Sequence, residues 1–145
     1  MSLTAIAAPA LNRSQLRDLL TALAVVSEHG YELTRFGDSG LAVGVPSALR
    51  DALAGIATAG QTAAARINAI VGGLTDMADL GGQLAAIPAD ELTALSTLMA
   101  IANDAYRATL PGDAPAADRY RWRDACDGAD VLTLIRASQV EADEE

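Results

Sequence analysis

The chain has 145 residues, of which 51% are hydrophobic and only 3% aromatic, and its 19 acidic residues outnumber its 10 basic ones to give a net charge of −9. This acidic balance opposes direct binding to nucleic acid or to anionic membrane surfaces. The single cysteine, Cys126, excludes an intramolecular disulfide and a cysteine-based zinc cluster. Together with an N-terminus that lacks the pattern of a signal peptide, it predicts a cytoplasmic protein.

The hydrophobic content comes mainly from aliphatic side chains, alanine above all, rather than from aromatic rings. Alanine loses no side-chain entropy on ordering, so such a chain favours helices that pack closely through small residues. The most apolar stretch, residues 52–74, is long enough to cross a bilayer, but it contains Gln61, Arg66 and Asn68. Their transfer into lipid is costly, so we predict helices without a membrane span.

Residues 1–13 are predicted to form an N-terminal tail. The first helix is expected to start with Ser14 as its N-cap and to end near Glu28, just before His29 and Gly30. Its apolar positions recur at intervals of three and four residues: Leu16, Leu19, Leu20, Leu23 and Val26. This spacing predicts an amphipathic helix with one buried face.

Two short β-prone runs follow this helix. Residues 31–36 alternate in polarity, residues 37–40 (Gly-Asp-Ser-Gly) are turn formers, and residues 41–45 alternate apolar and small side chains. Two such runs around a short Gly/Asp turn predict one small β-hairpin.

Residues 46–74 predict a pair of helices. Pro46 and Ser47 stop the second strand and start the first helix of the pair, and a break is expected near Gly60 before a helix that contains Ile67. With the first helix and the hairpin, this pair completes a helix–hairpin–helix–helix module over residues 14–74.

The rest of the chain predicts further helices. Residues 75–110 form a helical extension packed on the module, with a strong helix start at Pro88. Residues 111–115 are a linker, and residues 116–140 form a C-terminal helical region that is expected to break near Gly128.

An acidic tail, residues 141–145, follows this region. The predicted fold class is therefore mainly α with one small β-hairpin, in which an α-β-β-α-α N-terminal part precedes a helical extension.

The order of elements over residues 14–74 resembles that of the TubC-type docking domains at the N-termini of some peptide and polyketide synthase subunits. The residues that carry the resemblance are the leucines of the first helix, the run from His29 to Leu33, the Gly37-Asp38 turn before Leu41 and Val43, and Pro46. The resemblance implies an αββαα fold that dimerises and binds a short segment of another protein beside its hairpin.

No catalytic or metal-binding pattern emerges from the sequence. The Gly-Asp-Ser-Gly string at residues 37–40 matches the surroundings of a protease serine, but the only histidine, His29, lies at a predicted helix end, and no triad is assembled. Asp124, Asp127 and Asp130 recur every three residues, as on a solvated helix face, without the ligand spacing of a calcium loop. We therefore predict no enzyme activity, no cofactor and no metal.

The most unusual local composition surrounds the only tryptophan. Aromatic and arginine side chains are enriched in binding hot spots, and four lie together here: Arg119, Tyr120, Trp122 and Arg123. Equally, Trp122 and Cys126 could pack inward while the two arginines pair with Asp118 and Asp127. The edge of the predicted hairpin supplies the other partner-binding candidates: Tyr31, Leu33, Arg35, Leu41 and Val43.

Two functions follow from these features. The first is a non-catalytic protein–protein interaction module (an adaptor, docking or assembly subunit) that binds an unidentified protein and forms homo-oligomers through alanine- and glycine-lined helix faces between Ala52 and Leu84. The same small residues could instead form an internal core. The alternative is a small acidic regulatory inhibitor, of the kind that mobile elements encode, which blocks a nucleic-acid-handling partner.

Overall fold

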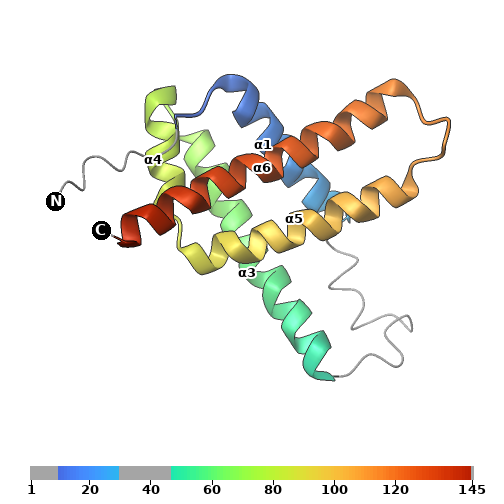
Figure 1. Ribbon diagram of the computed structural model, residues 1–145, viewed down its shortest axis with the longest axis horizontal. Helices are drawn as coiled ribbons and strands as arrows, with labels where there is room; N and C mark the ends of the chain where they lie inside the picture. The colour runs from blue at the N-terminus through green and yellow to red at the C-terminus, as the bar shows by residue number, and fades with distance from the viewer. Residues whose placement is uncertain (1–9, 30–46, 145) are drawn as a thin grey trace.

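The computed structural model describes residues 10–29 and 47–144. Helices account for nearly all of this part of the chain, with one short 3-10 turn, η3, among them (Figure 1). The elements in chain order are α1 (Arg13–His29), α3 (Ser47–Gly72), η3 (Met77–Asp79), α4 (Leu80–Ala85), α5 (Ala89–Thr109) and α6 (Ala116–Glu144).

Helices α5 and α6 form the long axis of the molecule, running side by side in opposite directions and joined by a short turn (Figure 1). Helix α1 packs against both of them, and α3 packs against α5. The short α4 lies between α3 and α6. All five α-helices of the described part contribute to one hydrophobic core, in which leucine predominates, as in Leu19, Leu84, Leu95 and Leu132, all of which are fully buried.

The predicted fold class is wrong in two respects. The described residues contain helices and no strand, so this part of the chain is all-α rather than mainly α with a β-hairpin. Residues 31–45, where the hairpin was predicted, lie outside the described residues. In addition, a single continuous helix, α3, occupies the place of the predicted helix pair. The division of the chain into a module, an extension and a tail stays a prediction.

The start of α1 is capped by a different residue from the one predicted. The Asn12 backbone N–H donates to Gln15 Oε1 at 2.9 Å, and the Gln15 backbone N–H donates to Asn12 Oδ1 at 2.8 Å. This reciprocal pair is the arrangement of a capping box, with Asn12 rather than Ser14 as the N-cap. The end of α1, predicted near Glu28, lies one residue later at His29, and the predicted helix after Pro88 is present as α5.

Gly60 does not break α3, because it serves as a packing position against α5. A Cβ atom at Gly60 would lie 2.9 Å from the Leu98 Cδ2 atom and 3.4 Å from the Leu95 Cα atom. The absence of a side chain therefore lets the two helix backbones approach each other closely. Burial of Ala57 and Ala63 on the same helix shows that small residues here serve an internal contact.

Gly128 has the same role where α1 meets α6. The predicted break is wrong, since α6 continues without interruption from Ala116 to Glu144. A Cβ atom at Gly128 would overlap the Asp18 backbone carbonyl group and lie 2.8 Å from the Ala22 Cβ atom. Only glycine leaves room for the α1 backbone at this crossing.

No single helix of the described part is long and apolar enough to cross a membrane. Two segments, Met77–Ala85 and Ala89–Ala108, meet the length and composition of a span only when taken together, and they are bent by 102° at the break between them.

Candidate interaction surfaces

An open groove separates α1 from α3. Both helices pack on α5, but they make at most slight contact with each other. One side of α1 therefore remains partly uncovered, and two cavities of about 440 and 230 Å³ follow one another along it. We call this feature the α1–α3 groove; its apolar lining comprises Leu16, Leu20, Leu23 and Val26 of α1, Ala64 and Ala65 of α3, Leu98 of α5, and Leu74 and Met77 beyond α3.

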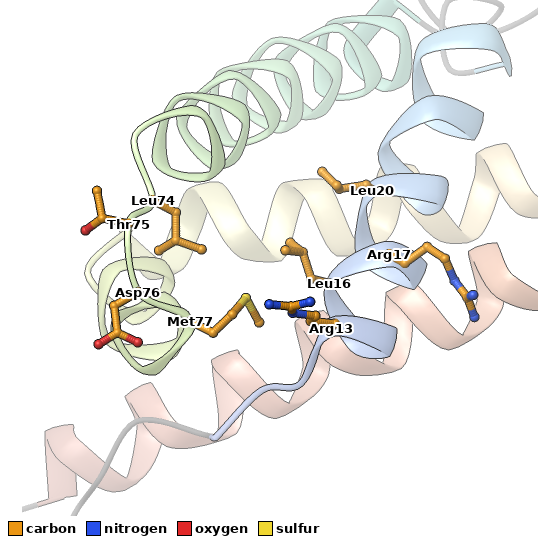
Figure 2. A pocket seen from close by; sticks show the side chains of 8 residues that line it. All are labelled: Arg13, Leu16, Arg17, Leu20, Leu74, Thr75, Asp76 and Met77. Carbon is orange, nitrogen blue, oxygen red and sulfur yellow. The ribbon is translucent and has the colours of Figure 1, made fainter.

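The larger end of the groove lies between the start of α1 and the segment that follows α3. Figure 2 shows Leu16 directed toward Leu74 and Met77 across this cavity. All three side chains are only half-buried, although they pack against the core. Arg13 extends from α1 toward Met77 and places a guanidinium group at the mouth of the cavity (Figure 2).

A second feature, which we call the arginine pocket, lies at the turn between α5 and α6. It is a cavity of about 360 Å³ whose lining includes three arginines and a tryptophan. Its lining residues are Arg107, Leu110, Pro111, Gly112, Arg119, Trp122 and Arg123. Tyr120, with 61% of its surface exposed, lies beside it in a smaller cavity that Arg119 and Arg123 also line.

Trp122 is the fixed element of this pocket. Its Nε1 donates a hydrogen bond of 3.2 Å to the backbone oxygen of Asn103, and its half-buried ring packs against the core. The Arg107 guanidinium lies 4.9 Å from the centre of the indole ring, within the range of a cation–π contact. Trp122 is thus partly core and partly pocket wall.

Arg119 and Arg123 do not pair with Asp118 and Asp127, the partners considered from the sequence. In the described ranges, 10–29 and 47–144, neither arginine forms an ion pair. Both are exposed and lie one helical turn apart on α6. Their charges are therefore available at the rim of the pocket.

Arg121, between these two residues, has a structural role instead. Its guanidinium donates two hydrogen bonds of 2.8 Å to the Glu28 carboxylate and lies 5.3 Å from the centre of the Tyr106 ring. The hydrogen bonds from Arg121 lower the pKa of Glu28 and raise that of Arg121. His29 stacks on Tyr106 with ring centroids 5.0 Å apart, so this cluster fastens the end of α1 to α5 and α6.

The remaining chemical candidates are the acidic side chains and the Cys126 thiol. In the described part of the chain, no group of three or more His, Cys, Asp or Glu side chains is placed to hold a metal ion. Burial, followed by the nearby carboxylates of Asp127, Asp130 and Asp104, raises the pKa of the Cys126 thiol. The thiol therefore stays protonated at neutral pH, which opposes nucleophilic chemistry at this residue.

The structure brings together only some of the predicted partner-binding residues. Arg119, Tyr120, Trp122 and Arg123 lie around the arginine pocket, whereas the hairpin candidates at residues 31–43 lie outside the described residues. The sequence interpretation missed Arg107, which the α5–α6 turn brings to the pocket from 12 positions before Arg119. It also missed the groove. The signal that could have indicated it is the wide apolar stripe of α1, to which Leu16 and Leu20 contribute.

Comparison with known protein families, with curated proteins and with solved structures finds no match for this chain.

Proposed function

We propose that this chain is a non-catalytic protein–protein interaction subunit that binds an amphipathic helix of a partner protein in the α1–α3 groove. The observation that carries the proposal is the gap between α1 and α3 above α5. Each of the helices α1, α5 and α6 packs on the other two. By contrast, α1 and α3 both pack on α5 but leave a gap between themselves. A helix laid on this side would cover the exposed parts of the lining side chains.

The dimensions of the groove fit such a helix. Leu16, Leu20, Leu23 and Ser27 line the α1 side over three turns, which corresponds to about 16 Å of helix at 1.5 Å per residue. A helix that enters a groove uses apolar anchors at the same intervals of three and four residues. The partner helix is therefore expected to contribute three or four apolar anchors.

Charge further defines the partner helix. Arg13 and Arg17 line the α1 side of the larger cavity, and Arg17 is 71% exposed at its side chain. The polar residues Gln61 and Asn68 line the α3 side of the smaller cavity. We expect a partner helix whose apolar face is flanked by acidic residues on the side that lies against α1.

The test uses a synthetic amphipathic helix with leucines at the stated intervals and glutamates on one flank. Methyl-labelled methionine provides the signal, because Met77 lines the groove and Met99 is fully buried in the core. Titration is expected to shift the Met77 methyl resonance to saturation and to leave Met99 nearly unchanged. A Met77 resonance that does not respond would contradict the proposal.

Matched variants separate the groove from general hydrophobic adhesion. Leu20→Glu places a charge in the groove, whereas Leu134→Glu changes a leucine that is 48% exposed on α6. We expect Leu20→Glu to abolish the Met77 shift and Leu134→Glu to retain it, with both variants showing wild-type helix content by circular dichroism. Equal loss in the two variants would rule out the groove as the binding site.

A further inference from the structure

The arginine pocket carries an inference that is independent of the groove. We propose that it binds the acidic segment 141–145 of a second copy of this chain, so that copies associate head to tail. Residues 141–145 contain four acidic residues and no basic one. Three arginines line the pocket, and two of them, Arg119 and Arg123, are exposed and without an ion pair in the described part of the chain.

The acidic segment cannot reach the pocket of its own chain. Arg119 and Arg123 of the pocket and residues 141–144 of the segment lie on the same uninterrupted helix, α6, which runs from Ala116 to Glu144. At 1.5 Å per residue, Arg123 and Glu141 are about 27 Å apart along the helix axis. This separation exceeds the Debye length of about 8 Å at physiological ionic strength, so the two charge clusters act on other molecules rather than on each other.

The charge order along α6 supports the same conclusion. A helix dipole favours acidic residues at the N-terminus and basic residues at the C-terminus. In α6 the last turn has no basic residue, and three arginines follow the lone first-turn acid, Asp118. Because this order is unfavourable within the isolated helix, contact with an oppositely charged partner compensates for it.

The positions of the two clusters define the kind of assembly. Figure 1 shows the start and the end of α6 at opposite ends of the molecule. A contact between unlike ends is heterologous, and it therefore propagates into a chain of copies unless the rotation closes a ring. The expected assembly grows with protein concentration and weakens with salt.

Two variants test the proposal by complementation. The pocket variant carries Arg119→Gln and Arg123→Gln, and the segment variant carries Glu141→Gln, Asp143→Asn, Glu144→Gln and Glu145→Gln. Each variant alone is expected to sediment as a monomer, because one of the two contact surfaces is missing. An equimolar mixture is expected to form a 1:1 complex and nothing larger, since one intact pocket meets one intact segment.

Several outcomes would overturn the proposal. They are a mixture that stays monomeric, a segment variant that associates like the wild type, and a wild-type chain that stays monomeric at low salt up to millimolar concentration. Arg136→Gln removes one charge from α6 outside the pocket and is expected to associate at least as strongly as the wild type. Raising the salt from low to molar concentration is expected to weaken wild-type association by about tenfold or more, because exposed charges are screened.

A peptide experiment keeps the proposal testable if the pocket variant does not fold. Trp122 is the only tryptophan and lines the pocket, so its fluorescence reports occupancy directly. A synthetic peptide of residues 136–145 is expected to change this fluorescence with a saturating, salt-sensitive curve, whereas the peptide with all four acids replaced by amides is not. Equal responses to the two peptides would show that charge recognition at the pocket is absent.

Discussion

Helix α1 meets its neighbours in opposite ways on its two sides. Toward α6 the backbones approach so closely that Gly128 has no room for a side chain, and Ala22 lies directly against it. Toward residues 74–77, which follow α3, the same helix leaves Leu16 and Leu20 half-buried beside an open cavity. Since apolar residues occur on both sides, hydrophobicity alone does not distinguish a closed contact from an open one. At the closed contact, small residues such as Gly128 and Ala22 let the two backbones approach each other.

The largest expected effect compares two adjacent leucines of α1. Leu19 is fully buried, and Leu20 lines the groove. Leu19→Ala is expected to lower the free energy of unfolding by about 3 kcal/mol, because it leaves a cavity in the core, whereas Leu20→Ala should cost about 1 kcal/mol. Urea unfolding followed by circular dichroism measures both. Similar losses for the two variants would show that the groove side is as closed as the core side.

The next prediction concerns the close contact between α1 and α6 at Gly128. Gly128→Ala is expected to destabilise the protein by about 2 kcal/mol, because the new methyl group overlaps the Asp18 carbonyl and forces α1 away from α6. Gly55→Ala is the matched control, since a Cβ atom there meets nothing within 4 Å. Removing a glycine from a helix interior should stabilise this control by up to about 1 kcal/mol. Chemical denaturation of the two variants is expected to give changes of opposite sign.

A smaller effect concerns the negative charge of Asp18, which lies where α1 meets α6. Burial first, and then the carboxylates of Asp124 and Asp127, raise the pKa of Asp18, whose Oδ1 atom has no hydrogen-bond partner. The folded state therefore binds this proton more tightly than the unfolded chain. The charged form opposes folding, and its cost develops as the pH rises from the ordinary pKa of 3.8 through the raised one.

Asp18→Asn is accordingly expected to raise the stability at pH 7 by about 0.5 to 1 kcal/mol. The gain should disappear in acid, well below the ordinary pKa of Asp18, where the wild-type carboxyl is also neutral. Unfolding curves recorded across this pH range measure the difference. Asp104→Asn, at an exposed position of α5, should change the stability little; a gain as large as that of Asp18→Asn would exclude burial as the cause.

The smallest effect has the opposite dependence on pH. The hydrogen bonds from Arg121 lower the pKa of Glu28, so this pair contributes stability above the ordinary Glu pKa of 4.5 and loses it as the pH falls through the lowered pKa. Because the Glu28 side chain is 51% exposed, the contribution is expected to be less than about 1 kcal/mol. Glu28→Gln should therefore reduce the stability at pH 7 and have no effect in strong acid. An unchanged stability at pH 7 would remove this pair from the forces that hold α1 on α6.

The sequence interpretation succeeded where local spacing decides the structure. The apolar intervals of α1 and the proline and acids at residues 88–91 located two helices within one or two residues of their observed bounds. It erred at Gly60 and Gly128, which were expected to end helices. A glycine weakens a helix by about 1 kcal/mol, but a close helix crossing outweighs that cost, and no local pattern reveals the crossing.

The two interaction surfaces also differ in how much of each could be predicted from the sequence. The composition around Trp122 identified one wall of the arginine pocket, because arginine and aromatic residues are unusual in this chain. Arg107 and the α1–α3 groove could not be predicted, since their positions depend on how α5 turns into α6 and on which helices α1 contacts.

The sequence by itself determined a helical, acidic chain, the positions of most helices and one cluster of binding-type residues. Short-range forces are sufficient for this, because helix periodicity, capping and charge all depend on residues within a few positions of one another. Only the tertiary structure decided which glycines are contact points, which apolar face of α1 is closed and which is open, and which arginines share a pocket. Those outcomes depend on the packing of side chains from distant helices, where a single methyl group determines how closely two backbones approach.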